Sequence, residues 1–158
     1  MKKLLILLFA GASSLSVTAQ QQNSMNYEAD KAAVIVVVKR FLTAAGDYDI
    51  ESMPAMFTDN ANIGGASLRN GKWSTYTVTL EGFLERLRSE RDPKKYTEPV
   101  SEFTVHMAEG MLAFVMADAL IIRNGHTQAK NFDYFTLIKQ NGDWRILNGS
   151  YVSIPVED

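Results

Sequence analysis

Two Asn-Gly pairs, Asn124-Gly125 and Asn141-Gly142, limit the fold of this chain more than any other feature. Each pair lies between two segments in which apolar and polar residues alternate, which is the pattern of a half-buried strand. Asn-Gly favours the two-residue type I′ turn, because the twist of that turn matches the twist of the flanking strands. Each pair therefore predicts a hairpin and also predicts which residues of its two strands face each other.

The period of the apolar residues changes along the chain, from helical in the first part to alternating after Thr97. Gly46 is a stop signal for the first helix, and Thr79 is a cap for the third, which must end before Pro93. Helices followed by an antiparallel meander indicate an α+β domain. The predicted helices are 27–45, 50–57 and one starting at Leu80; the predicted strands are 61–67, 98–108, 111–123, 127–140 and 143–154.

Counting outward from the turns predicts the composition of each sheet face, because directly opposed residues share a face. The count starts with Arg123 opposite His126 and with Gln140 opposite Asp143. A polar group then gathers beside apolar side chains, which is the composition of a pocket lining. The predicted pocket residues are Asp118, Asn131, Asp133, Asn148 and Ser150, bordered by Met116, Phe103 and Phe135, with Phe41 from the first helix and Trp73 from a loop at the mouth.

This face assignment depends on regular strands, since one β-bulge would exchange the faces beyond it. The three helices can cover only one face, and we expect them to cover the face with the polar group. The opposite face, which includes Ala113, Val115, Ala117 and Tyr134, is then left for a partner subunit.

Asp118 and Asp133 are the candidate catalytic residues. Two nearby carboxyls raise the pKa of one of them, as a general acid/base pair requires. The same two side chains also fit a role as polar anchors for a ligand that is not transformed, or as members of a structural hydrogen-bond network. The counted register places His106 on the opposite face, and the chain has no Cys, so we expect no transition-metal site and no cofactor.

The ends and the charge add expectations about location and partners. Residues 1–19 combine two lysines, an apolar stretch and a small-x-small ending, which is typical of a secretory signal peptide. Gln-rich residues 20–26 read as a linker, and residues 27–156 as one domain. The chain has 16 Lys and Arg against 18 Asp and Glu and shows no basic stripe, which disfavours nucleic acid as a partner.

Two strings resemble the nuclear transport factor 2-like superfamily, which includes proteins similar to ketosteroid isomerases and the SnoaL-like cyclases. They are Gly46-Asp47-Tyr48-Asp49 followed by Met56-Phe57-Thr58-Asp59-Asn60-Ala61, and Phe135-Thr136-Leu137-Ile138-Lys139 followed by Asn141-Gly142-Asp143-Trp144-Arg145-Ile146. The resemblance covers residues 27–154. It implies a cone in which three N-terminal helices pack in the concave face of a curved antiparallel sheet, commonly as a dimer.

The steroid isomerases of that superfamily use a first-helix Tyr and an Asp that this chain lacks. Phe41 and the segment Ile63-Gly64-Gly65 stand at the corresponding places, which argues against such an isomerase. The sequence therefore predicts an exported, homodimeric protein that binds a partly apolar small molecule in the cone. The alternatives are a lyase, isomerase or cyclase that uses Asp118 and Asp133 for proton transfer, and a dimerisation module without catalysis.

Overall fold

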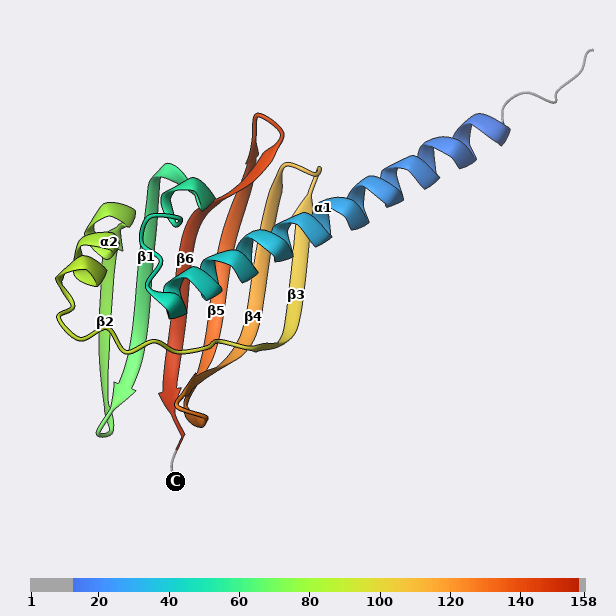
Figure 1. Ribbon diagram of the computed structural model, residues 1–158. Coiled ribbons are helices and arrows are strands. Elements are labelled where there is room, and N and C mark those ends of the chain that lie inside the picture. The colour runs from blue at the N-terminus through green and yellow to red at the C-terminus, as the bar shows by residue number, and fades with distance from the viewer. Residues whose placement is uncertain (1–12, 157–158) are drawn as a thin grey trace, which may run out of the picture.

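A curved sheet of six strands carries a long helix across its concave face (Figure 1) in the computed structural model, which describes residues 13–156. The strand order is β2-β1-β6-β5-β4-β3, and a second helix lies over the β1–β2 end. The elements are α1 (Ser13–Asp47), η1 (Pro54–Met56), β1 (Phe57–Arg69), β2 (Lys72–Thr79), α2 (Leu80–Ser89), β3 (Val100–Ala108), β4 (Leu112–Arg123), β5 (His126–Gln140) and β6 (Asp143–Pro155).

This architecture confirms the α+β class and corrects two parts of the expectation. The described chain has two α-helices rather than three, because the predicted helix 50–57 is reduced to a single turn, η1. Pro54 begins that turn and Phe57 already belongs to β1, which leaves too few residues for a longer helix. The sheet is mixed rather than purely antiparallel, since β1 and β6 run parallel.

Burial explains why α1 is helical through a run of β-branched residues. Val34 and Val38 lie one helical turn apart and are fully buried, whereas Val36, on the opposite side of the helix, is 54% exposed. A strand would have placed all three of these residues on one face. Packing of the buried stripe against the sheet outweighs the modest helix propensity of Val.

The predicted signal peptide and linker fall on the N-terminal part of the chain. Residues 1–12 lie outside the described residues, and Ser13 begins α1, which continues through the predicted linker 20–26. This part of α1 extends past the β3 edge of the sheet (Figure 1). Within residues 13–156, no helix is both long enough and apolar enough to cross a membrane. Export stays a prediction.

Asp30 fixes the position of α1 over the hairpin of β5 and β6. Its Oδ1 accepts hydrogen bonds from Lys139 Nζ at 2.6 Å and from Trp144 Nε1 at 3.0 Å. The hydrogen bond from Lys139, and then the one from Trp144, hold the pKa of Asp30 below its usual value. Trp144 is buried, so this contact also satisfies an indole N–H that would otherwise be costly to shield from water.

The predicted turns are confirmed. Both residues of Asn124-Gly125 and of Asn141-Gly142 have positive φ, as a type I′ turn requires, and the strands beside them start in the predicted register. A third pair, Asn70-Gly71, has the same geometry and joins β1 to β2. The sequence reading missed this hairpin and left Trp73 in a loop. Trp73 lies on the edge strand β2 and is 56% exposed.

The predicted register is wrong away from the hairpin tips. The causes are two β-bulges, at Gln128 and Leu147, and a turn that is longer than expected. The pairing shifts by one residue between Ile121 and Ile122 of β4, and by one residue between Thr136 and Leu137 of β5. The β3–β4 turn contains three residues rather than two, since Ala108 pairs with Leu112.

The shifted register corrects the predicted partners of the pocket residues. Asp118 lies opposite Phe132 instead of Asn131, and Asp133 lies opposite Ala117 and Tyr151 instead of Met116 and Ser150. Phe135 lies opposite Gly149 instead of Asn148. Each of these shifts is a single residue, which is enough to move a side chain to the other face of the sheet.

Candidate functional site

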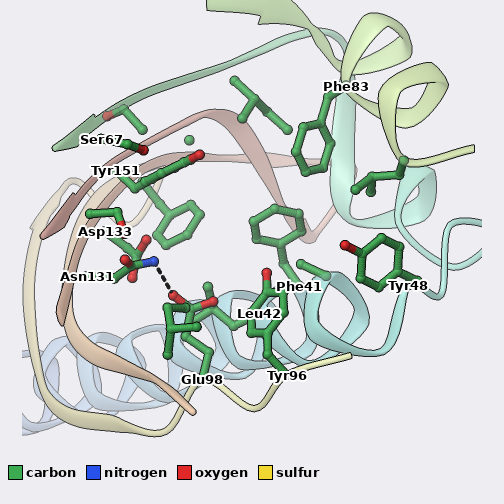
Figure 2. A pocket seen from close by; sticks show the side chains of 18 of the residues that line it. Phe41, Leu42, Tyr48, Ser67, Phe83, Tyr96, Glu98, Asn131, Asp133 and Tyr151 are labelled. Atoms are coloured by element: carbon green, nitrogen blue, oxygen red, sulfur yellow. Dashed lines mark hydrogen bonds between the residues drawn. The ribbon is translucent and has the colours of Figure 1, made fainter. Parts of the chain in front are cut away.

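A cavity of about 350 Å³ lies in the concave face, between the sheet, the end of α1, α2 and the segment that precedes β3 (Figure 2). This volume is in the range of small-molecule sites. Its lining combines aromatic and aliphatic side chains with carboxyl, amide, hydroxyl and guanidinium groups. The lining residues are Phe41, Leu42, Ala45, Tyr48, Ile63, Ser67, Arg69, Phe83, Leu87, Tyr96, Glu98, Ile121, Arg123, Asn131, Asp133, Phe135, Gly149, Ser150, Tyr151 and Ser153.

Three phenylalanines form the apolar side of the cavity. Phe41 of α1 lies 5.8 Å from Phe135 of β5 and 6.4 Å from Phe83 of α2, measured between ring centroids. These separations are typical of aromatic pairs. The ring of Phe135 lies over Gly149, where a Cβ atom would stand only 3.1 Å from the ring. Because Gly149 has no side chain, the Phe135 ring has room to pack at this position.

The segment that precedes β3 closes the cavity opposite the sheet. Thr97 exchanges two backbone hydrogen bonds of 2.9 Å with Ile122, and the Tyr96 N–H donates to the Gly46 carbonyl at the end of α1 over 3.0 Å. Side chains alternate along extended backbone, so the two neighbours of the exposed Thr97 turn inward. Tyr96 and Glu98 therefore both line the cavity (Figure 2).

Glu98 and Asp133 form a buried carboxyl pair at the polar side of the cavity. Asp133 is only 3% exposed, and burial raises its pKa to about 8, with further contributions from the Glu98 carboxyl. Burial also raises the pKa of Glu98 to about 7, against the opposing effect of hydrogen bonds with Asn131 and Asp133. Two carboxyls can share a hydrogen bond only if one is protonated, so the pair holds a proton near neutral pH.

Asn131 connects this pair to the rest of the cavity. Its Nδ2 donates to Glu98 Oε1 at 2.7 Å, as the dashed line in Figure 2 shows. Its Oδ1 and Asp133 Oδ2 are shielded from water and have no hydrogen-bond partner in the part of the chain that the structure describes. Buried polar atoms are seldom left without partners, so these two oxygens indicate where a bound molecule would donate.

Tyr48 reaches the cavity from a strained backbone position at the end of α1. The Asp49 N–H donates to the Ala44 carbonyl and the Tyr48 N–H to the Ala45 carbonyl, which is the Schellman pattern of a helix end. The residue that takes the left-handed conformation in this motif is Tyr48, with φ of 59°, rather than a glycine. A bulky residue there costs about 1 kcal/mol. Tyr48 lines the cavity from this position.

The structure brings together only part of the predicted site. Phe41, Asn131, Asp133 and Phe135 line the cavity, and Ser150 contributes to its edge. Trp73 lies far out on β2, and Phe103 packs at the margin of the core, with Lys39 Nζ 5.4 Å from its ring centroid. Whether any of these residues binds a ligand stays a prediction.

The other predicted residues lie on the outer, convex face of the sheet. Ala113, Val115 and Ala117, which were expected on the face left for a partner, are instead buried on the concave face, since they pair with Leu137, Phe135 and Asp133.

A depression of about 380 Å³ on the convex face is lined by Met116, Asn148 and Ser150, together with exposed Phe114 and Tyr134. Asp118 shares that face as the neighbour of Phe132 across the strands, and it lines neither hollow. The bulges therefore separate Asp118 from Asp133, and Glu98 replaces Asp118 as the partner of Asp133.

Glu98, Tyr96 and Tyr48 are the functional candidates that the sequence reading missed. Glu98 lies in an irregular segment, where no periodicity indicates the direction of a side chain. Asn70-Gly71, by contrast, was a readable signal for the β1–β2 hairpin. Among the described residues, no group of three His, Asp or Glu side chains is arranged to hold a metal ion.

The fold is similar to solved structures of NTF2-like proteins. One, of unknown function, from Shewanella baltica OS155 has a TM-score of 0.61 at 18% identity, covering 82% of this chain and 98% of that protein. One from Cytophaga hutchinsonii has a TM-score of 0.61 at 19% identity, covering 78% of this chain and 98% of that protein. One with a cystatin-like fold from Novosphingobium aromaticivorans has a TM-score of 0.63 at 12% identity, covering 92% of each chain. These similarities confirm the NTF2-like fold that the resemblance implied.

The comparison with curated proteins finds no match. The model of one family, with the description "Putative lumazine-binding", matches residues 29–152, which span α1 from its middle to the last strand. The matched range contains every residue that lines the cavity except Ser153. The chain therefore has an NTF2-like fold and belongs to the family described as Putative lumazine-binding.

Proposed function

We propose that the concave cavity binds a small, flat, partly apolar molecule. The observation that carries this proposal is the pair of unpartnered oxygens, Asn131 Oδ1 and Asp133 Oδ2, beside an aromatic wall. A ring held against Phe41 and Phe135 would bury apolar surface. Its polar edge would donate to the two oxygens. A cavity with this division between apolar and polar sides is typical of small-molecule sites.

Lumazine, a pteridinedione, is a suitable probe. Its edge alternates N–H donors and carbonyl acceptors, which is the pattern that a carboxylic acid and an amide can bind. The family description names this molecule and supports the choice. Affinity measurements with lumazine and other flat heteroaromatic compounds would identify which member of this class binds most tightly.

Asn131→Leu tests the site directly. The substitution replaces the amide oxygen and nitrogen with methyl groups in a side chain of the same branching. We expect lumazine affinity, measured by quenching of lumazine fluorescence, to fall about tenfold or more, which is the cost of lost buried hydrogen bonds. Asn148→Leu is the matched control, because the same chemical change is made on the outer face.

The two variants separate the possible sites. Equal affinity of wild type and Asn131→Leu, or a loss confined to Asn148→Leu, would contradict binding in the concave cavity. Melting temperatures of both variants, measured without ligand, show whether a loss of affinity reflects a loss of folded protein.

A second candidate function is proton-transfer catalysis in the same cavity. The observation that favours it is a carboxyl pair whose pKa values, about 7 and about 8, lie near neutral pH. Such a group can both donate and accept a proton. The pair is Glu98 with Asp133, rather than Asp118 with Asp133. NMR spectroscopy of a ligand recovered after incubation distinguishes the two functions, since proton transfer rearranges the ligand without changing its mass, whereas a binding protein returns the ligand unchanged.

We also propose export and a homodimer. The basic and then apolar start of the chain supports export, and exposed Phe114 and Tyr134 on the outer face support a partner there. In the homodimer, Tyr134→Arg should halve the mass measured by light scattering, because it places a charge in an apolar interface. Val36→Arg, on the outer side of α1, should leave the mass unchanged. A dimer mass for Tyr134→Arg would argue against this interface.

A further inference from the structure

A guanidinium group in the cavity has no counterpart in the proposed function so far. Arg123 Nε is shielded from water and has no hydrogen-bond partner among the described residues. Arg123 and Arg69 both line the cavity, and neither forms an ion pair within residues 27–156, whose side chains the structure describes. A shielded N–H without an acceptor is costly, and an oxyanion would supply the acceptor.

The topology places both arginines at one end of the sheet. Arg69 ends β1 and Arg123 ends β4. Because β1 runs parallel to β6, and because β4 and β6 are both antiparallel to β5, the C-terminal ends of β1 and β4 lie at the same end of the sheet (Figure 1). Ser67 and Ser153, each two residues from the end of its strand, add hydroxyl groups to the same part of the lining.

The carboxyl pair lies deeper along the same strands. Asn131 pairs with Ala119, four residues before Arg123, which is roughly 13 Å along the strand. Asp133 pairs with Ala117, one further step inward. The cavity therefore has a cationic rim and an acidic interior. A negative group would be repelled by the interior and attracted by the rim, which defines one orientation for a charged ligand.

We propose that the ligand of this cavity is an elongated molecule with an oxyanion, either a carboxylate or a phosphate, that Arg123 binds at the rim with support from Arg69. The neutral ring lies inward, between the phenylalanines and the carboxyl pair. This inference rests on the proposed function, because it adds a charge preference to the same site. It narrows the ligand class from flat apolar molecules to flat apolar anions.

The test uses two probes that differ by one sulfonate group: anilinonaphthalene sulfonate, which is an anion, and its neutral parent, N-phenylnaphthylamine. Both fluoresce in apolar cavities. In wild type we expect the sulfonate to bind about tenfold more tightly than the parent, as for one charge-assisted hydrogen bond. In Arg123→Met that preference should fall to about twofold or less, with the affinity for the parent retained. Lys130→Met removes one charge on the outer face, near the same end of the sheet, and should keep the wild-type preference.

Each other outcome contradicts a defined part of the account. Saturable binding of the parent without a preference for the sulfonate in wild type, or a preference that survives in Arg123→Met, overturns the anion site alone. Failure of both probes to bind wild type overturns the proposed function and the anion site together. If Arg123→Met does not fold, Arg123→Gln and the salt dependence of wild type replace it. Added salt should lower the affinity of wild type for the sulfonate and leave its affinity for the parent unchanged. An equal loss of affinity for both probes would overturn the proposal.

Discussion

Replacing Asp133 with Asn should make the ligand-free protein more stable than wild type at pH 8 and should flatten the dependence of its stability on pH. The pKa of Asp133 is about 8 in the folded protein against an ordinary value of 3.8, so the folded state keeps a proton that the unfolded chain has lost. The stability that comes from this proton is complete below about pH 4 and is lost as the pH rises through 8. The variant has no ionisable group at position 133, so only the smaller pH dependence that comes from Glu98 remains.

The size of this effect is on the order of a few kcal/mol at pH 8, because each unit of pKa difference corresponds to about 1.4 kcal/mol. Melting temperatures measured between pH 5 and pH 9 should fall steeply for wild type and weakly for Asp133→Asn. Asp118→Asn is the control, since the same change on the outer face should leave most of the slope. A slope in Asp133→Asn equal to that of wild type would show that the pair does not hold a shared proton.

Gly46→Ala should destabilise the protein by about 2–4 kcal/mol, because the added atom overlaps backbone that has no room to move. A Cβ atom on Gly46 would collide with the Tyr96 carbonyl oxygen. The same two residues share the hydrogen bond that attaches the wall segment to α1. Relief of the collision requires this segment to move away, and Glu98 moves with it, so ligand affinity should fall as well.

The matched control is Gly82→Ala in α2. A Cβ atom there would make contacts no closer than 3.4 Å, to Thr79 Oγ1, which is ordinary packing. Ala favours a helix over Gly by up to about 1 kcal/mol, so this variant should be neutral or slightly stabilised. Thermal unfolding of both variants by circular dichroism gives the comparison. A melting temperature for Gly46→Ala as high as that of Gly82→Ala would contradict the tight contact with Tyr96.

The two glycines also show why the sequence predicts elements better than contacts. Gly46 was read as a helix stop, yet α1 ends in a Schellman motif with Tyr48 in the left-handed position. The reason for a glycine at position 46 is the approach of a segment fifty residues away in the chain. Local rules describe local backbone, and they contain no information about such a partner.

The two Asn-Gly hairpins that join β4, β5 and β6 were predictable because they follow from local chemistry. Asn-Gly turns and alternating side chains predicted β4, β5 and β6 closely, and the first pairs beside the turns are as expected. The face assignment failed because the bulges at Gln128 and Leu147 carry no marked residue type. Each moves the following side chains to the other face, and together they sent Asp118 and Asn148 to the convex side.

Part of the candidate site was therefore predictable, for a physical reason. Asn131, Asp133 and Phe135 alternate along one strand, so they stay together whatever the register of their neighbours. Glu98 belongs to an irregular segment that is fixed by tertiary hydrogen bonds through Thr97. Its meeting with Asp133, which produces the raised pKa values, is a property of the folded chain alone.

The most direct test of the central claim is a crystal structure of the protein grown with lumazine at saturating concentration. The account predicts lumazine in the concave cavity, its ring between Phe41 and Phe135 and its polar edge within hydrogen-bond distance of Asn131 and Asp133. Lumazine bound instead in the outer depression beside Tyr134, or an empty concave cavity at a concentration that saturates binding in solution, would contradict it.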